Sequence, residues 1–80
     1  MENASHFHTP TGNQVKQARA ALGLSQRQLA KLAGVALSTV VAYERGQRPP
    51  YDSTIAKLRQ TLEAAGVRFV EGGVIMSANG

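Results

Sequence analysis

The chain has 80 residues, which is enough for one small domain with a modest core. It contains no cysteine, and this excludes a disulfide framework and any thiolate metal site. No stretch approaches the roughly 18 apolar residues of a membrane span, and the N-terminus lacks the basic start and apolar run of a secretory signal. We therefore expect a cytoplasmic protein.

The net charge of +4 is unevenly distributed along the chain. Between Thr11 and Tyr51 the only acidic residue is Glu44. The basic residues of the same stretch are Lys16, Arg19, Arg27, Lys31, Arg45 and Arg48. A polyanionic partner such as duplex DNA would explain this excess of positive charge. A solvated basic surface that aids solubility explains it equally well from charge alone.

Residues 1–10 show no hydrophobic periodicity and end in a proline, so they are predicted to form a flexible N-terminal arm. His6 and His8 form an H-x-H pair in this arm. A metal site would need a third ligand, and none lies nearby in the sequence, so no metal is expected to bind.

Two helix starts follow the arm, and each has a capping box. Thr11 with Gln14 predicts a first helix from about Gly12 or Asn13 to Leu22, closed by Gly23. Ser25 with Gln28 predicts a second helix that ends at Gly34. The inward-facing residues of these helices recur at helical spacing; they are Val15, Ala18, Leu22, Leu29, Ala30 and Ala33.

A third helix is predicted over about Leu37–Arg45, with Gly46 after it. Only Val40 and Tyr43 are placed to enter the core from this helix. The connection between the second and third helices is then the three residues 34–36. Two helices joined this tightly cross at a steep angle.

The remaining chain begins with a loop, because two prolines in residues 47–51 cannot continue a helix. Asp52 is predicted to cap a fourth helix, roughly Ser53 to Ala65, with Ile55, Leu58 and Leu62 on its inner face. Residues 67–70 and 74–76 have the composition of short strands. The segment 67–80 is therefore expected to be a strand extension. It would either pack on its own domain or contact a second subunit, since an isolated hairpin is marginal in water.

The most informative pattern is QRQLAKLAGVALSTVVAYER, residues 26–45. Small Ala30 lies where the two helices come closest, and Gly34 lies at a turn that requires positive φ. The chain resembles the phage-repressor and Cro-like family of helix-turn-helix regulators, also called the xenobiotic-response-element family. The resemblance runs from about Asn13 to Leu62 and is carried by VKQARAALGLSQRQLAKLAGV, TVVAYERGQRPP and TIAKLRQTLEAAGV.

The resemblance implies an all-α fold class. We expect a compact lambda-repressor-like domain of four to five helices over residues 11–66, with a short C-terminal β-hairpin or strand extension. It also implies a double-stranded DNA partner: the second helix crosses the DNA backbone and the third enters the major groove.

Site residues follow from the same resemblance. At the start of the second helix, Gln26 would bind a phosphate through its side chain and backbone N–H. The residues expected at phosphates are Gln26, Arg27, Thr39, Arg45, Gln47 and Arg48. The residues expected at base edges are Ala36, Leu37, Ser38, Val41 and Ala42. Arg19 and Glu44 match residues that pair in the family, so a structural ion pair is expected between the first and third helices.

The third helix departs from the family pattern in two ways. Ala36 stands where many relatives have a Ser or Thr cap. No Asn, Gln, Arg or Lys lies between Leu37 and Ala42, so these positions cannot make bidentate contacts to guanine or adenine. We therefore hypothesise that an A·T-containing site is recognised by apolar contact with thymine methyl groups and by DNA shape. The alternative is that Leu37, Val41 and Ala42 form a protein-binding surface.

Three classes of function can be compared with these features of the sequence. The first is a transcriptional repressor that binds a two-fold operator as a homodimer, with half-sites about 34 Å apart and strands 67–70 and 74–76 as the candidate dimer contact. The second is a protein-interaction module with the same fold, for example an antitoxin-type partner binder, although nothing in the sequence identifies a toxin. An enzyme is not expected, because histidine occurs only in the arm and the acidic residues are dispersed. No cofactor is expected either.

Overall fold

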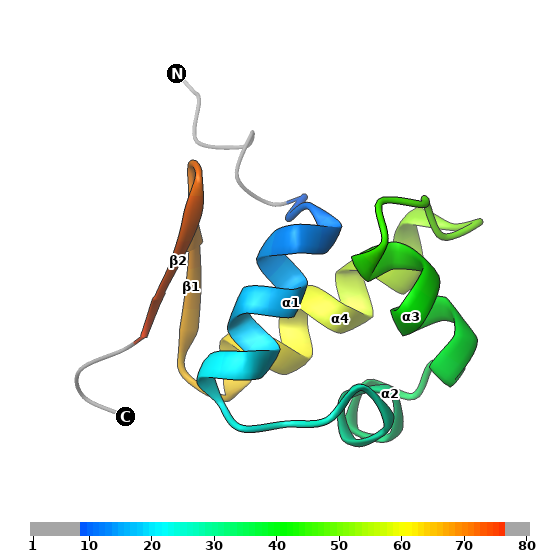
Figure 1. The fold of residues 1–80 in the computed structure, drawn as a ribbon, viewed down its shortest axis with the longest axis horizontal. Coiled ribbons are helices and arrows are strands. Elements are labelled where there is room, and N and C mark those ends of the chain that lie inside the picture. Colours follow the sequence, from blue (N-terminus) through cyan, green and yellow to red (C-terminus); the bar gives the residue numbers. More distant parts are fainter. Residues whose placement is uncertain (1–8, 77–80) are drawn as a thin grey trace.

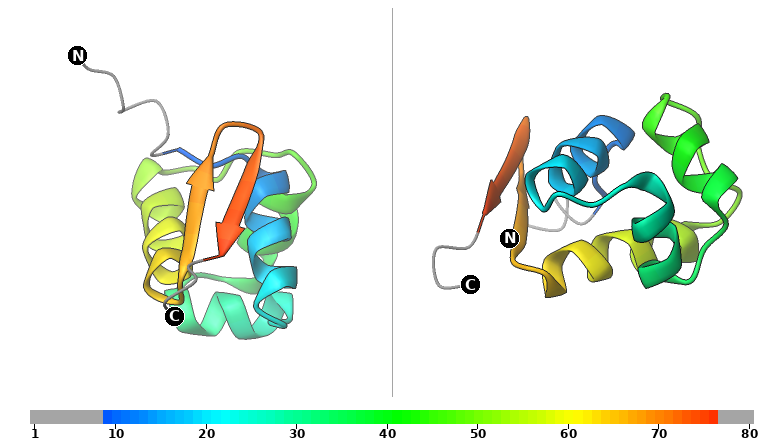
Figure 2. Two further views of the ribbon diagram at one scale, coloured as in Figure 1. Left: turned by 90° about the vertical axis from the view of Figure 1, so that its left-hand side faces the viewer. Right: turned by 60° about the horizontal axis from the view of Figure 1, so that its bottom comes forward.

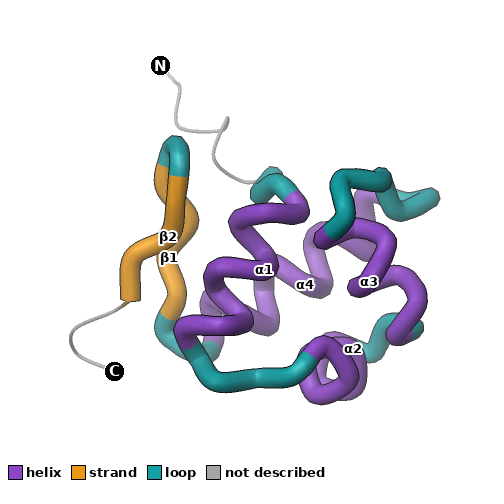
Figure 3. Tube along the Cα trace, viewed as in Figure 1, coloured by secondary structure: helices purple, strands orange, loops and turns teal. Residues whose placement is uncertain are grey.

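The computed structural model describes residues 9–76, so most of the predicted arm, including His6 and His8, lies outside the described residues. Four helices are followed by one antiparallel hairpin (Figure 1 and Figure 3). The elements are α1 (Gly12–Ala21), α2 (Gln26–Ala33), α3 (Leu37–Glu44), α4 (Asp52–Ala64), β1 (Val67–Val70) and β2 (Gly73–Met76). The mostly helical architecture with a C-terminal hairpin agrees with the expected fold, and the number of helices in residues 9–76 is four.

Local sequence signals account for most helix ends. Both predicted capping boxes are present, because the side chains of Thr11 and Ser25 each accept from the backbone N–H three residues on. The backbone N–H groups of Thr11 and Ser25 in turn donate to the side-chain oxygens of Gln14 and Gln28. Gly34 ends α2 in the left-handed conformation, with φ 73° and ψ 34°. Ala36 provides no side-chain cap to α3, as its apolar side chain predicts.

One predicted helix start was wrong. Asp52 is the first residue of α4 and does not cap it; Tyr51 is the cap and makes no side-chain hydrogen bond to the helix. In the first turn Asp52 still places a negative charge at the positive end of the helix dipole. Three helices, α1, α3 and α4, each end one residue before the approximate end predicted for them, so that Leu22, Arg45 and Ala65 are their C-terminal caps.

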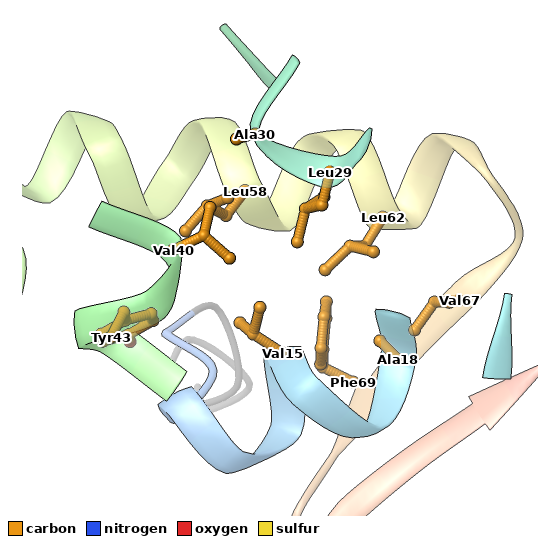
Figure 4. Packing of buried hydrophobic residues seen from close by; sticks show 10 residues of the cluster. All are labelled: Val15, Ala18, Leu29, Ala30, Val40, Tyr43, Leu58, Leu62, Val67 and Phe69. Atoms are coloured by element: carbon orange, nitrogen blue, oxygen red, sulfur yellow. The ribbon is translucent and has the colours of Figure 1, made fainter. Parts of the chain in front are cut away.

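The core lies where all four helices and β1 meet (Figure 4). It consists of ten buried apolar residues: Val15, Ala18, Leu29, Ala30, Val40, Tyr43, Leu58, Leu62, Val67 and Phe69. Among the described residues no polar or charged residue is fully buried. Each fully buried Leu or Val stabilises the fold by roughly 1.5–3 kcal/mol, so this small cluster is the main source of stability.

The hairpin packs on its own domain. Val67 and Phe69 point into the core, and Val67 pairs with Met76 while Phe69 pairs with Val74. β1 lies over α4 and β2 lies over α1, so the hairpin closes one end of the helical body (Figure 2). The sequence predicted that the strands would pack either on their own domain or against a second subunit. In the single chain they pack on their own domain.

Gln14 ties this hairpin to α1. Its Nε2 donates to the carbonyl oxygens of Val70 at 2.6 Å and Gly73 at 2.9 Å, which flank the hairpin turn. Its Oε1 meanwhile accepts from the Thr11 backbone N–H at 2.9 Å. The sequence pattern predicted the capping bond alone. One side chain therefore serves both a helix start and the docking of the C-terminal strands.

The start of α1 packs closely against the end of α3. Gly12 is buried, and a Cβ added there would overlap the carbonyl oxygen of Tyr43. The Tyr43 hydroxyl donates to the carbonyl oxygen of Pro10, which is itself fully buried. Pro10 therefore belongs to the packed body of the domain, although it was expected to end the flexible arm.

Burial raises the pKa of the Tyr43 hydroxyl above its usual value of 10, and nearby Arg48 opposes the shift. The folded state thus favours the neutral hydroxyl. The resulting stability is fully present below pH 10 and is lost as the pH rises through the folded pKa. We expect urea unfolding to show that Tyr43→Phe loses less stability than the wild type above pH 10. Tyr51→Phe is the control, because Tyr51 is 68% exposed; equal alkaline losses in all three proteins would contradict the prediction.

Candidate nucleic-acid interface

α2 and α3 form a compact two-helix unit around a three-residue connection. Residues 34–36 join the helices, as predicted, and Val35 N–H donates to the Ala30 carbonyl at 3.0 Å across the turn. Gly34 makes the sharp reversal, since its φ of 73° is a conformation that favours glycine. Because of this turn, α3 runs at a steep angle to α2 and lies at the edge of the domain (Figure 1).

The two faces of α3 differ in character. Val40 and Tyr43 point into the core, which confirms the predicted inward pair. Four other residues recur at i, i+3, i+4 and i+7 and share the opposite face; they are Ser38, Val41, Ala42 and Arg45. Ser38 and Arg45 are exposed, and Val41 and Ala42 are partly exposed. The first three of these side chains are small, so another surface could approach the backbone of α3 closely there, and Arg45 adds a basic group at the end of the face.

Not every predicted base-contacting residue lies on this outer face. Ala36, just before α3, is exposed, but Leu37 is partly buried and packs against the core. Leu37 therefore differs from the expectation that it projects outward with Val41. The reason is its position, because Leu37 lies three residues before Val40, about one turn away, on the side of α3 that borders the core.

Exposed polar and basic side chains lie on the two segments that precede and follow α3 in the chain. α2 contributes Arg27 and Lys31, and the segment after α3 contributes Arg45, Gln47 and Arg48, all of them exposed. Thr39, another predicted phosphate contact, is partly exposed. Exposed positive charge is therefore present on α2 and directly after α3, as a surface that binds a polyanion requires.

Arg19 and Glu44 form the expected ion pair between α1 and α3. Arg19 Nε donates to Glu44 Oε2 at 2.8 Å, and Arg19 Nη2 donates to Glu44 Oε1 at 3.1 Å. The Glu44 side chain is only 3% exposed and that of Arg19 16%. The hydrogen bonds from Arg19 to Glu44 raise the pKa of the guanidinium, while burial acts in the opposite direction.

The pairing neutralises the only acidic residue of the Thr11–Tyr51 stretch. The other basic residues of that stretch are Lys16, Arg27, Lys31, Arg45 and Arg48, and all five are exposed. The excess positive charge of this stretch therefore lies at the surface. Glu44 does not neutralise it, because its carboxylate is paired with Arg19.

Two further hydrogen bonds join this ion pair to α2 and to the segment just before it, and sequence reasoning missed both. Gln26 Nε2 donates to Glu44 Oε1 at 3.0 Å, and Arg19 Nη1 donates to the Leu24 carbonyl at 2.8 Å. Gln26 was expected to bind a phosphate through its side chain, but the side-chain nitrogen already donates a hydrogen bond to Glu44. No local pattern indicates this bond, because its partners are 18 residues apart on different helices.

We expect replacement of Arg19 by methionine to destabilise the fold by about 3 kcal/mol, because it leaves a buried carboxylate without its cationic partner. Urea denaturation checks this. Arg27→Met is the matched control: Arg27 is exposed on α2, so its replacement should change stability by no more than about 0.5 kcal/mol. Similar stabilities for the two variants would show that the ion pair is energetically unimportant.

Residues 9–76 contain no group of three or more His, Asp or Glu side chains placed to hold a metal ion. Within the same part of the chain, no helix is long and apolar enough to cross a membrane.

Comparison with known families gives one match. A family model described as Helix-turn-helix matches residues 15–64, which covers most of α1 and all of α2, α3 and α4. The match ends before the hairpin. No curated protein matches the chain.

Proposed function

This chain belongs to the helix-turn-helix family of the Cro and xenobiotic-response-element type, and we propose that it is a sequence-specific transcriptional repressor in the cytoplasm. The observation that carries the proposal is the outer face of α3, where Ser38, Val41 and Ala42 are small and at least partly exposed, together with the exposed basic residues on α2 and directly after α3. This arrangement suits insertion into the major groove, with phosphates held on either side.

Within this proposal the contacts divide into two groups. Phosphates are contacted by Gln26 at the N-terminus of α2 and by five further residues, which are Arg27, Thr39, Arg45, Gln47 and Arg48. Ala36, Ser38, Val41 and Ala42 approach base edges, and Leu37 adds at most its outer rim because it packs on the core. With so few hydrogen-bonding side chains, selectivity depends on thymine methyl groups and on DNA shape.

A homodimer on a two-fold operator is part of the proposal, and the outer face of the hairpin is its proposed contact. Ile75 lies on that face and is 50% exposed. The hairpin and α3 lie at opposite ends of a domain 35 Å long (Figure 1). A dimer that joins hairpin to hairpin would place its two α3 helices at the far ends of the assembly, so their separation would exceed one helical turn of DNA. If the selected half-sites are only about 34 Å apart, which is one helical turn, the two subunits must pair through a different surface.

The test is a binding selection from random duplex DNA with the wild type and with the double variant Gln26→Ala, Ser38→Ala. We expect an enriched two-fold motif that the variant loses or binds weakly, and the motif's spacing tests the hairpin contact. Affinity for the selected duplex should fall more than threefold between 50 and 200 mM salt, because basic side chains displace counterions from phosphates.

Two other outcomes would overturn the proposal. Salt-sensitive retention of DNA without a motif would indicate a non-specific or architectural binder. No retention at low salt would instead favour the protein-interaction module, for which the 65% exposed Leu32 on α2 would be a first residue to test.

A further inference from the structure

The side chain of Gln26 is held by the protein before any DNA is present. Its Nε2 donates at 3.0 Å to Glu44 Oε1, the same oxygen that accepts from Arg19 Nη2. The carboxylate is almost completely buried, and its second oxygen accepts from Arg19 Nε. Gln26 itself is partly exposed at the first position of α2. One end of its amide is therefore anchored inside the domain, and the residue still reaches the surface.

The chemistry of the carboxylate determines which end of the amide faces Glu44. An ionised carboxylate only accepts hydrogen bonds, so the amide must turn its nitrogen toward Glu44. That nitrogen carries two hydrogens, and Glu44 uses one of them. A phosphate oxygen also only accepts, so the second hydrogen is the group that the side chain of Gln26 can offer to DNA. An unanchored glutamine would have to lose rotamer freedom to make the same contact.

Arg19 makes this arrangement compatible with a polyanion. A bare carboxylate hydrogen-bonded to a phosphate-binding amide would repel the phosphate. The bidentate contact from Arg19 neutralises Glu44, and the Arg19 bond to the Leu24 carbonyl ties the pair to the segment just before α2. The three side chains thus connect α1, the start of α2 and the end of α3.

We propose that Glu44 is a positioning residue for DNA binding, which orients the Gln26 amide toward a phosphate of the operator. This inference rests on the proposed function, because it assigns a role within the same interface. It makes a prediction of opposite sign to simple electrostatics. Removal of a negative charge beside DNA should tighten binding, whereas loss of the positioning contact should weaken it.

The experiment is a double-mutant cycle on the dissociation constant for the selected duplex, with wild type, Glu44→Gln, Gln26→Met and the double variant. We expect each single variant to bind about tenfold to 100-fold more weakly, the size of one hydrogen bond to a charged group. The double variant should bind no more weakly than Gln26→Met alone. Glu63→Gln is the control for charge removal, because Glu63 is exposed on α4; its affinity should be unchanged or slightly higher.

A second variant and a second measurement cover the case in which Glu44→Gln does not fold. Glu44→Asp keeps the charge but shortens the side chain, and it too should weaken binding. In the free wild type, the side-chain amide protons of Gln26 should exchange more slowly than those of exposed Gln60 in NMR spectra. Tighter binding by Glu44→Gln, multiplicative losses in the cycle, or equally fast exchange at Gln26 and Gln60 would overturn the inference. Failure of the wild type to bind any duplex would instead overturn the proposed function.

Discussion

Replacement of Gly12 by alanine is expected to destabilise the folded protein by about 3 kcal/mol or more, at the upper end of overpacking effects. The added Cβ would overlap the Tyr43 carbonyl oxygen and would lie 2.7 Å from the carbonyl carbon and 3.2 Å from the Glu44 Cα. All three atoms belong to the backbone, so no side chain can rotate away to make room. α1 and α3 would have to move apart, and this would disturb both the Arg19–Glu44 pair and the core.

Urea denaturation of Gly12→Ala and Gly73→Ala checks this expectation. Gly73 is the matched control, because a Cβ there would meet only the Gln17 Oε1, at 4.0 Å, and its φ is not positive. The control should change stability by no more than about 0.5 kcal/mol. Since alanine is the better helix former, a Gly12→Ala protein that is as stable as the wild type would show that the two helices do not approach this closely.

Val41→Asp is expected to abolish specific DNA binding, with a loss of at least about 100-fold in affinity. Val41 is partly exposed on the outer face of α3, between Ser38 and Arg45. A carboxylate at this position would face base edges and phosphates, so it would be repelled and would lose its hydration on binding. The fold should survive, because the core residues of α3 are Val40 and Tyr43.

Electrophoretic mobility shift or fluorescence anisotropy with the selected duplex measures the effect. Thr61→Asp is the control: it adds the same carboxylate at a partly exposed residue of α4, outside α2, α3 and the hairpin. Thermal melts confirm that both variants are folded. If Val41→Asp bound the operator as tightly as Thr61→Asp, α3 would not be the element that contacts the bases.

The docking of the hairpin limits how two subunits of the proposed repressor can pair. The hairpin, which is the proposed dimer contact, is docked on α1 and α4 of its own chain through Gln14, Val67 and Phe69. Only its outer face and edges remain for a partner. The operator's half-site spacing therefore reports on the mode of assembly, and a single selection experiment tests both the DNA contact and the dimer contact.

The sequence by itself determined the features that depend on short stretches of chain. Capping boxes at Thr11 and Ser25, the left-handed turn at Gly34 and the absent cap at Ala36 all involve residues within three or four positions of one another. Hydrophobic spacing determined which faces of α1, α2 and α4 are buried. The Arg19–Glu44 pair was expected from the resemblance to a family, and the folded protein contains it.

The remaining features depend on how the helices meet, and they are visible only in the folded protein. The requirement for glycine at position 12 arises from the approach of α3, and the orientation of Gln26 arises from a carboxylate 18 residues away. Gln14 docks the hairpin through bonds that span 56 and 59 residues, and Leu37 turns toward the core because of the way α3 lies on it. These contacts depend on distances of a few ångströms between separate elements, and such distances follow from packing of the whole core and from no local pattern in the chain.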